Sequence, residues 1–106
     1  MREVDKDTFA AEVLEESNFV VVDYFGDGCV PCAALLPDIE ALAEQYSDKA
    51  KFVKLNTSKA RRLAIGQKVL GLPTIVLYKN GEKVVELIKE AATKESIQEM
   101  ILRHTN

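Results

Sequence analysis

The chain has 106 residues, enough for one compact domain and too few for two. Apolar residues make up 47 % and charged residues 29 %, an ordinary balance for a globular protein in water. The formal net charge is −3 and no run of five Lys or Arg occurs, so we expect no binding to nucleic acid or anionic lipid. No stretch approaches the roughly 18 consecutive apolar residues of a membrane helix. Residues 1–7 are mostly polar and charged and contain no apolar h-region of a secretory signal, so we expect a cytoplasmic protein.

The first half of the chain alternates between helical and strand spacing of its apolar residues. Helical spacing covers Thr8–Glu16, with Asp5 or Asp7 available as the N-cap. Phe19–Phe25 is a nearly continuous β-branched and aromatic run, which predicts a strand buried on both faces. Cys29–Tyr46 returns to helical spacing with one broad apolar face.

The second half contains a strand, a weaker helix, two paired strands and a last helix, over Lys51–Asn56, Ser58–Lys68, Thr74–Lys79 with Glu82–Ile88, and from Thr93 onward. Asn80-Gly81 between the paired strands is the strongest short signal for a hairpin. Strand–helix–strand units early in the chain imply parallel pairing with helices on both faces, and the hairpin adds antiparallel strands. We therefore predict an α/β fold with a central mixed sheet, in which residues 1–106 form a single domain and a monomer.

The two cysteines of the chain lie three positions apart, in Cys29-Val30-Pro31-Cys32, at the start of a predicted helix. A structural disulfide closing so short a loop would restrict the unfolded chain very little. Unsatisfied N–H groups and the helix dipole favour a thiolate at Cys29. Cys32 lies one turn further on the same side, where its sulfur can attack a mixed disulfide formed at Cys29. Pro31 needs no N–H donor in the first turn.

The alternative for this pair is half of a zinc site. Such a site needs four ligands, usually completed by a second cysteine pair or two histidines. The chain contains two cysteines and a single histidine, His104. We therefore expect a redox-active pair and no metal held within this chain.

Asp23 interrupts the apolar run six residues before Cys29. In one interpretation the strand bends there and the carboxylate reaches water. In the other, the carboxyl group is buried, has a raised pKa and exchanges a proton with Cys32. A buried charge is costly unless it is neutralised or paired, and Lys54 on the adjacent predicted strand is a candidate partner. We favour the second interpretation because perturbed acids cluster at active sites.

Leu72-Pro73-Thr74 is the third informative segment. Pro73 is compatible with an ordinary residue at the start of a strand. It is equally compatible with a cis proline whose backbone lies against the sulfurs and pairs with a passing substrate chain. These residues leave the isomer open.

The combination of Val21–Phe25, the CxPC motif at Cys29–Cys32, Gly71–Thr74 and Lys79–Glu82 resembles the thioredoxin family. The motifs occur in the family's order and at its approximate spacing, and the resemblance covers nearly the whole chain. A CxxC pair alone would be a weak signal. Asp23 before it and Gly71–Thr74 after it make the signal strong.

The resemblance implies a thioredoxin fold and a cis peptide bond at Pro73. It implies that Cys29 is the exposed attacking thiol and Cys32 the buried resolving thiol. It also implies that Asp23 is a buried proton-transfer acid, assisted by the cation of Lys54. It also implies a docking site for partner proteins, surrounded by Gly28, Val30, Pro31, Leu72 and Pro73. The implied substrates are protein disulfides, and no cofactor is implied beyond the Cys29–Cys32 disulfide. Re-reduction would come from a flavin-containing thioredoxin reductase using NADPH, or from a ferredoxin-linked counterpart.

The chain departs from the family pattern around the cysteines. Gly28 stands where the family usually has Trp, Val30 where it has Gly, and Ala33 where a basic residue is common. Residues 88–91 lack the glycine found there in the family, and the first strand is reduced to a few residues around Arg2–Val4 or missing. Loss of the Trp removes a large apolar contact surface beside the nucleophile. We therefore expect altered docking of partners and reductase.

The sequence thus predicts a dithiol reductant that reduces protein disulfides. Two other functions are alternatives to it. One is a non-catalytic interaction module, which retention of Cys29, Cys32, Asp23 and Pro73 disfavours. The other is a disulfide-forming oxidase of an exported compartment, which the polar start of the chain and the apolar Val30 disfavour.

Overall fold

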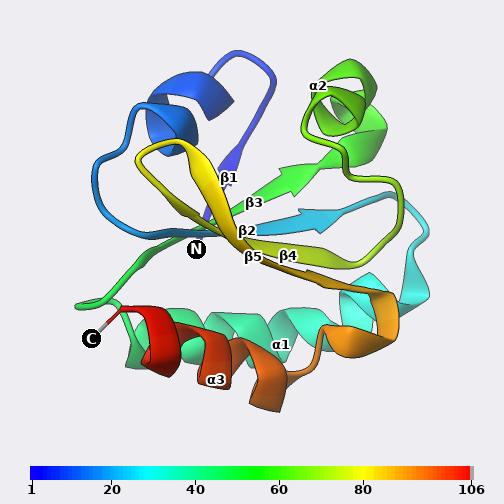
Figure 1. The fold of residues 1–106 in the computed structure, drawn as a ribbon. Helices are drawn as coiled ribbons and strands as arrows, with labels where there is room; N and C mark the ends of the chain where they lie inside the picture. The colour runs from blue at the N-terminus through cyan, green and yellow to red at the C-terminus, as the bar shows by residue number, and fades with distance from the viewer. Residues whose placement is uncertain (106) are drawn as a thin grey trace.

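The computed structural model describes residues 1–105 and shows one five-stranded sheet with helices on both faces (Figure 1). The strands are β1 (Arg2–Val4), β2 (Val20–Phe25), β3 (Lys51–Asn56), β4 (Thr74–Lys79) and β5 (Glu82–Ile88). Their order across the sheet is β1-β3-β2-β4-β5. β3 runs parallel to β1 and β2, whereas β4 runs antiparallel to β2 and β5. The predicted α/β fold with a central mixed sheet is confirmed.

The helices divide between the two faces of the sheet. α1 (Val30–Gln45) and α3 (Lys94–His104) cover one face, and α2 (Arg61–Gly66) lies on the other (Figure 1). The π-helical turn η1 (Ala10–Leu14) shares the face of α2. Among residues 1–105, no helix is long and apolar enough to span a membrane.

The central strand β2 explains the two cores. Alternate side chains of a strand point to opposite faces. Val20, Val22 and Tyr24 therefore join the core beneath η1 and α2, while Val21 joins the core beneath α1 and α3. Asp23 shares the parity of Val21 and is placed on the α1 side. The prediction of a strand buried on both faces is confirmed, since Val20–Tyr24 are all buried.

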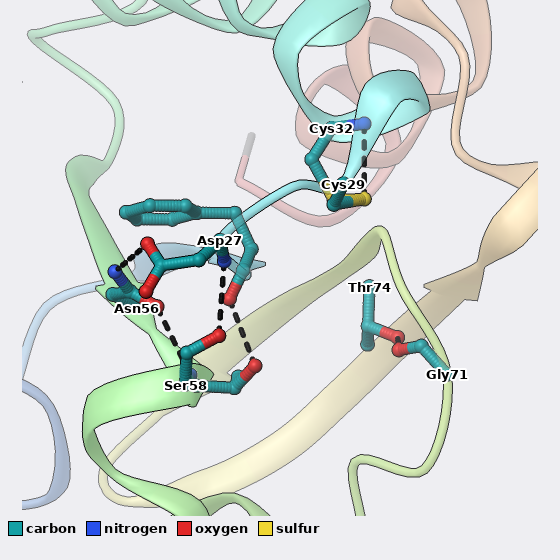
Figure 2. Close-up of a disulfide and its surroundings, with 9 residues drawn as sticks. Asp27, Cys29, Cys32, Asn56, Ser58, Gly71 and Thr74 are labelled. Atoms are coloured by element: carbon teal, nitrogen blue, oxygen red, sulfur yellow. Dashed lines mark hydrogen bonds between the residues drawn. A yellow bond between two sulfur atoms is a disulfide. The ribbon is translucent and has the colours of Figure 1, made fainter.

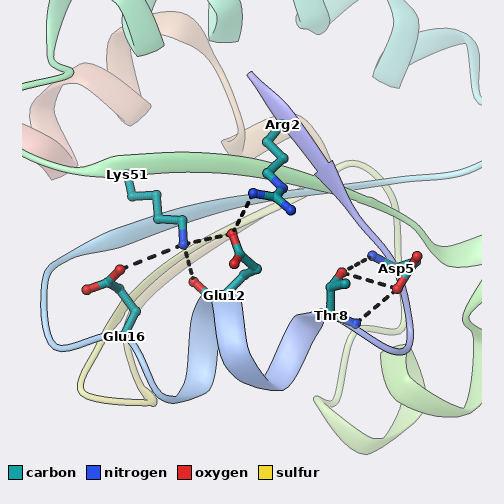
Figure 3. Close-up of polar contacts among 6 residues, drawn as sticks. All are labelled: Arg2, Asp5, Thr8, Glu12, Glu16 and Lys51. Carbon is teal, nitrogen blue, oxygen red and sulfur yellow. Dashed lines mark hydrogen bonds and ion pairs between the residues drawn. The ribbon is translucent and has the colours of Figure 1, made fainter.

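The helix predicted over Thr8–Glu16 is wrong in type and length. The segment forms the short π-helix η1, in which the N–H of Glu15 bonds to the carbonyl of Ala10. In the turn before it, Asp5 Oδ1 accepts the N–H of Thr8 at 2.9 Å (Figure 3). A residue from β3 also contacts η1.

This residue is Lys51, the first residue of β3. Its Nζ donates to the carbonyl of Glu12 at 2.9 Å and lies 3.1 Å from the Glu12 carboxylate (Figure 3). Lys51 Nζ also lies 3.7 Å from a carboxylate oxygen of Glu16, and Arg2 lies 3.5 Å from the Glu12 carboxylate. These contacts join η1 to residues distant in the chain, so the spacing of apolar residues within the segment does not predict its π-helical winding.

The helix predicted over Ser58–Lys68 is also divided. The structure has a 3₁₀ turn η2 (Thr57–Lys59) and then α2 (Arg61–Gly66), because Ala60 between them has the non-helical dihedrals φ −148° and ψ 50°. The side chain of Asn56 caps η2 by accepting the N–H of Ser58 at 2.9 Å. The first strand, which the sequence left in doubt, is present as β1.

The hairpin and the last helix follow the predicted turn chemistry. Asn80 and Gly81 have φ of 52° and 79°, the left-handed conformation that a two-residue hairpin needs. A Cβ atom at Gly81 would lie 2.5 Å from the carbonyl oxygen of Leu14, so the turn also requires a residue without a side chain. α3 begins after Thr93, which forms a capping box with Ser96.

Candidate active site

Cys29 is the N-cap of α1, and Cys32 lies in its first turn, joined to Cys29 by a disulfide (Figure 2). The Cα atoms are 5.3 Å apart, and the N–H of Cys32 points at the Cys29 sulfur at 3.3 Å. Pro31 occupies the first turn without leaving a donor unsatisfied. Cys29 is partly exposed, whereas Cys32 is only 5 % exposed. The outer sulfur is therefore the accessible one.

The loop before Cys29 is held by a polar network that the sequence analysis did not identify. The N–H of Asp27 donates to Ser58 Oγ at 2.9 Å, and Asn56 Nδ2 donates to Asp27 Oδ1 at 3.0 Å (Figure 2). Gly28 completes the turn with φ of 73°, a conformation that glycine adopts without strain. The end of β3 thus positions the start of α1. The polar residues Asn56 and Ser58 were visible in the sequence, but their partner lies some thirty positions away.

Asp23 is buried at 2 % exposure in the middle of β2. Its sheet neighbours in register are Lys54 on β3 and Ile75 on β4. Burial raises the pKa of Asp23 to about 7, and the positive charge of Lys54 opposes that rise. Among residues 1–105 the two side chains form no ion pair. Lys54 instead lies over the ring of Phe25, with 5.8 Å from Nζ to the ring centroid.

One cavity of about 410 Å³ brings most of the predicted site residues together. It is lined by the two cysteines, the acid and the cation, and by two of the predicted docking residues: Cys29, Cys32, Asp23, Lys54, Gly28 and Val30. A group with a pKa near 7 is half-ionised at neutral pH, which suits proton transfer. The arrangement can therefore deliver or remove a proton beside the disulfide.

The other three predicted docking residues line a second cavity of about 730 Å³, between the start of α1 and the segment before α3: Pro31, Leu72 and Pro73. The Leu72–Pro73 peptide bond is cis, as the family resemblance implied. The carbonyl of Pro73 accepts the N–H of Lys89 at 2.7 Å, which ties this loop to the end of β5. The predicted docking residues thus border two hollows, one lined by Val30 and the other by its chain neighbour Pro31.

The described residues 1–105 contain no group of three His, Cys, Asp or Glu side chains placed to hold a metal ion. The site consists of sulfur, a buried acid and a nearby cation. Its chemistry is that of thiols and disulfides.

Comparison with known proteins decides the family. The family profile described as thioredoxin matches residues 1–103. A thioredoxin of Peptoclostridium acidaminophilum is 63 % identical over 102 residues, covering 96 % of this chain and 93 % of that protein. The chain belongs to the thioredoxin family. A thioredoxin of Acetoanaerobium sticklandii is 51 % identical over 104 residues, covering 98 % of this chain and 99 % of that protein.

Similarity within the thioredoxin family extends to more distant members. An M-type chloroplastic thioredoxin of Chlamydomonas reinhardtii is 37 % identical, covering 97 % of this chain and 73 % of that protein. The family and the Cys29–Cys32 disulfide together make this protein a thiol–disulfide oxidoreductase with a redox-active cysteine pair. Family membership implies protein disulfides as its substrates and a reductase as its partner.

The departures from the usual thioredoxin pattern change the surface beside the disulfide. Val30 is 77 % exposed and offers an apolar side chain next to Cys29, whereas Gly28 on the other side of Cys29 offers none. Glu90 and Lys89 line or border the second cavity where the family tends to have glycine. Charged groups therefore stand at the rim of this cavity.

Proposed function

We propose that this thioredoxin reduces protein disulfides through attack by Cys29. In the reduced protein, the Cys29 thiolate attacks one sulfur of a substrate disulfide, forms a mixed disulfide and releases the other substrate sulfur as a thiolate. The position of Cys29 at the N-cap of α1, with an N–H directed at its sulfur, supports this role. Its partial exposure supports access by a protein substrate.

Cys32 completes the reaction by resolving the mixed disulfide. Its thiol passes a proton to Asp23, its sulfur attacks Cys29 Sγ, and the second substrate sulfur leaves as a thiolate that takes a proton from water. The substrate gains two electrons, and the protein is left with the Cys29–Cys32 disulfide. The cavity shared by Asp23, Cys29 and Cys32 is the observation that carries this proposal. Lys54 assists by stabilising the ionised form of Asp23.

The proposal also covers where substrates dock, how the protein is reduced again and where it works. We propose that partners dock around Gly28, Val30, Pro31, Leu72 and Pro73, which border the two hollows beside the disulfide. A thioredoxin reductase returns the protein to the dithiol state, and no bound cofactor or metal takes part. Residues 1–106 act as a single-domain monomer in the cytoplasm, where the reducing environment maintains the dithiol.

Insulin reduction with dithiothreitol as the electron source tests the proposal. The wild-type protein should accelerate precipitation of the insulin chains well above the dithiothreitol control. Cys29→Ser should lose this acceleration because no thiolate remains to attack. Full activity of Cys29→Ser, or none in the wild-type protein, would contradict the proposal and favour a non-catalytic interaction module.

Cys32→Ser is the matched variant. It retains the attacking thiol and lacks the resolving one, so it should accumulate a mixed disulfide with substrate that mass spectrometry detects. The adduct should disappear when Cys29 is also replaced. An equilibrium with a glutathione redox buffer separates a reductant from a disulfide-forming oxidase, because the oxidase has a much higher reduction potential.

A further inference from the structure

The positive charge of this acidic chain is concentrated in one segment. Residues 57–81 contain five Lys or Arg and no Asp or Glu, although the whole chain has a net charge of −3. The rest of the chain therefore carries −8. A local surplus of this size attracts molecules of opposite charge even when the whole protein is acidic.

Four of these cations surround the short helix α2 and are exposed: Lys59, Arg61, Arg62 and Lys68. Four other cations of the protein are paired with carboxylates, among them Lys51 with Glu12, Lys83 with Glu86 and Arg103 with Glu99. Among residues 1–105, none of the four cations around α2 forms an ion pair with a carboxylate. Their charge is thus available to a partner.

Exposed apolar side chains lie among these cations. Leu70 is 86 % exposed and Ile65 is 64 % exposed. Both line a groove of about 340 Å³ together with Arg61 and Leu72. Large aliphatic side chains this exposed, next to a concave surface, are a feature of protein contact sites. We call Lys59, Arg61, Arg62, Ile65, Lys68 and Leu70 the α2 surface.

The α2 surface adjoins the redox site. Leu72 lines both the groove beside α2 and the cavity that contains Pro31 and Pro73. A methyl group at Gly26, in the loop before Cys29, would lie 2.9 Å from Leu72 Cδ1. Ser58, which also lines the groove, accepts the N–H of Asp27. A protein chain reacting at Cys29 therefore passes within reach of the α2 surface.

We propose that the α2 surface binds an acidic segment of the partner protein, which places an aliphatic side chain beside Leu70 and Ile65. This inference rests on the proposed function and names the class of substrate that the same site prefers. Charge complementarity with the four cations accelerates the encounter, and the apolar contact supplies the specific fit. The acid in the neighbouring loop, Asp27, has its carboxylate held by Asn56.

Three matched peptides test the preference. Each contains the same intramolecular disulfide with a neighbouring leucine, and the flanking positions are all Glu, all Gln or all Lys. The rate constant for oxidation of the reduced protein by each peptide is measured by acid quench and chromatography. We expect the Glu peptide to react faster than the Lys peptide, on the order of tenfold at low salt, and less so at high salt.

Charge reversal locates the effect. Arg61→Glu with Lys68→Glu should abolish or invert the ratio of the Glu and Lys rates, and using the ratio cancels any general change in thiol reactivity. Lys49→Glu with Arg103→Glu changes the net charge equally but away from α2, and should retain the ratio. An unchanged ratio in the first variant, or an equal loss in the second, would overturn the inference.

The apolar part has its own test. Replacing the peptide leucine by alanine should slow the reaction of the wild-type protein with the Glu peptide, whereas Leu70→Ser should lose this difference. Absence of any difference in the wild-type protein contradicts the apolar contact. A single-stranded oligonucleotide that inhibits as strongly as a redox-inert peptide of equal charge would indicate general polyanion binding instead.

The neutral peptide separates the two proposals. If the wild-type protein reduces none of the peptides, including the Gln peptide, the proposed function is wrong and this inference is lost with it. If it reduces the Gln peptide normally but the Glu and Lys peptides at equal rates, the inference about the α2 surface alone is wrong.

Discussion

Buried polar groups on the two faces of the sheet have different surroundings: hydrogen-bond partners inside the fold on one face, and a cavity on the other. On the face of η1 and α2, the hydroxyls of Tyr24 and Tyr78 bond to each other at 2.6 Å, and Tyr78 also donates to Gln67 Oε1 at 3.0 Å. On the face of α1 and α3, Asp23 has a buried carboxyl group that borders a cavity with the disulfide. The tyrosines are satisfied inside the fold, whereas the acid faces reacting atoms.

This contrast separates a structural polar group from a functional one. Burial raises the pKa of Tyr78 to about 12 and that of Tyr24 further, so both remain neutral at any physiological pH. Burial raises the pKa of Asp23 only to about 7, where it changes charge in the working range. A buried group with internal partners stabilises the fold, and a buried acid beside a cavity can exchange protons.

Replacing the buried acid should give the largest change in stability. The folded pKa of Asp23 is about 7 against an ordinary value of 3.8, so the folded state binds the proton more tightly than the unfolded state. The free energy of unfolding therefore falls as pH rises from about 4 to about 7, and the cost is fully present above pH 7. Asp23→Asn should stabilise the disulfide form by a few kcal/mol at pH 8 and very little at pH 4. Urea unfolding at both pH values measures this.

The same variant should lose activity. Without a proton acceptor beside Cys32, insulin reduction by Asp23→Asn should slow, and the rise in rate through about pH 7 should vanish. A variant that is stabilised only at high pH yet keeps the wild-type pH–rate profile would show that Asp23 is buried without a catalytic role. Equal stabilisation at pH 4 and pH 8 would contradict the raised pKa itself.

Tyr78→Phe probes the other face and should destabilise the protein. It leaves the buried Tyr24 hydroxyl without its partner, which costs about 1–3 kcal/mol. Insulin reduction at 25 °C should stay close to the wild-type rate, because the tyrosine pair lies across the sheet from the disulfide. Urea unfolding and the insulin assay measure the two effects.

Replacing both tyrosines is the control for that interpretation. Tyr24→Phe with Tyr78→Phe removes both hydroxyls and leaves only the half-buried Gln67 oxygen without its bond. It should therefore be less destabilised than Tyr78→Phe alone. A double variant that is less stable than the single variant would mean that the rings, rather than the hydrogen bond, dominate.

Lys54→Met should give the smallest effect. Lys54 lowers the pKa of Asp23, so its removal should move the midpoint of the pH–rate profile upward by roughly half a unit. Lys54→Arg retains the charge and should retain the midpoint. If both variants shift the midpoint equally, the lysine side chain itself, whose Nζ lies over the Phe25 ring, matters more than its charge.

Much of the fold was predictable because the local signals were strong. The strands at Lys51–Asn56, Thr74–Lys79 and Glu82–Ile88 have the predicted bounds, and the Asn80-Gly81 turn and the Thr93 cap act as expected. The predictions failed where distant residues decide the local winding. η1 is tied to Lys51, and the helix near α2 is interrupted at Ala60 after a cap from Asn56.

The amino-acid sequence by itself determined the chemistry of the site: two cysteines at the start of a helix, an acid in an apolar strand and a proline before a later strand. Side-chain type and spacing along one element are local properties, so they can be recognised without coordinates. The tertiary structure alone decided which of these groups share a cavity, how far burial raises the pKa of Asp23, and that Asn56 and Ser58 hold the loop before Cys29. It also placed the groove beside α2 next to the cavity of Pro31 and Pro73, with Leu72 lining both, because sheet order and loop contacts bring together segments that the chain keeps apart.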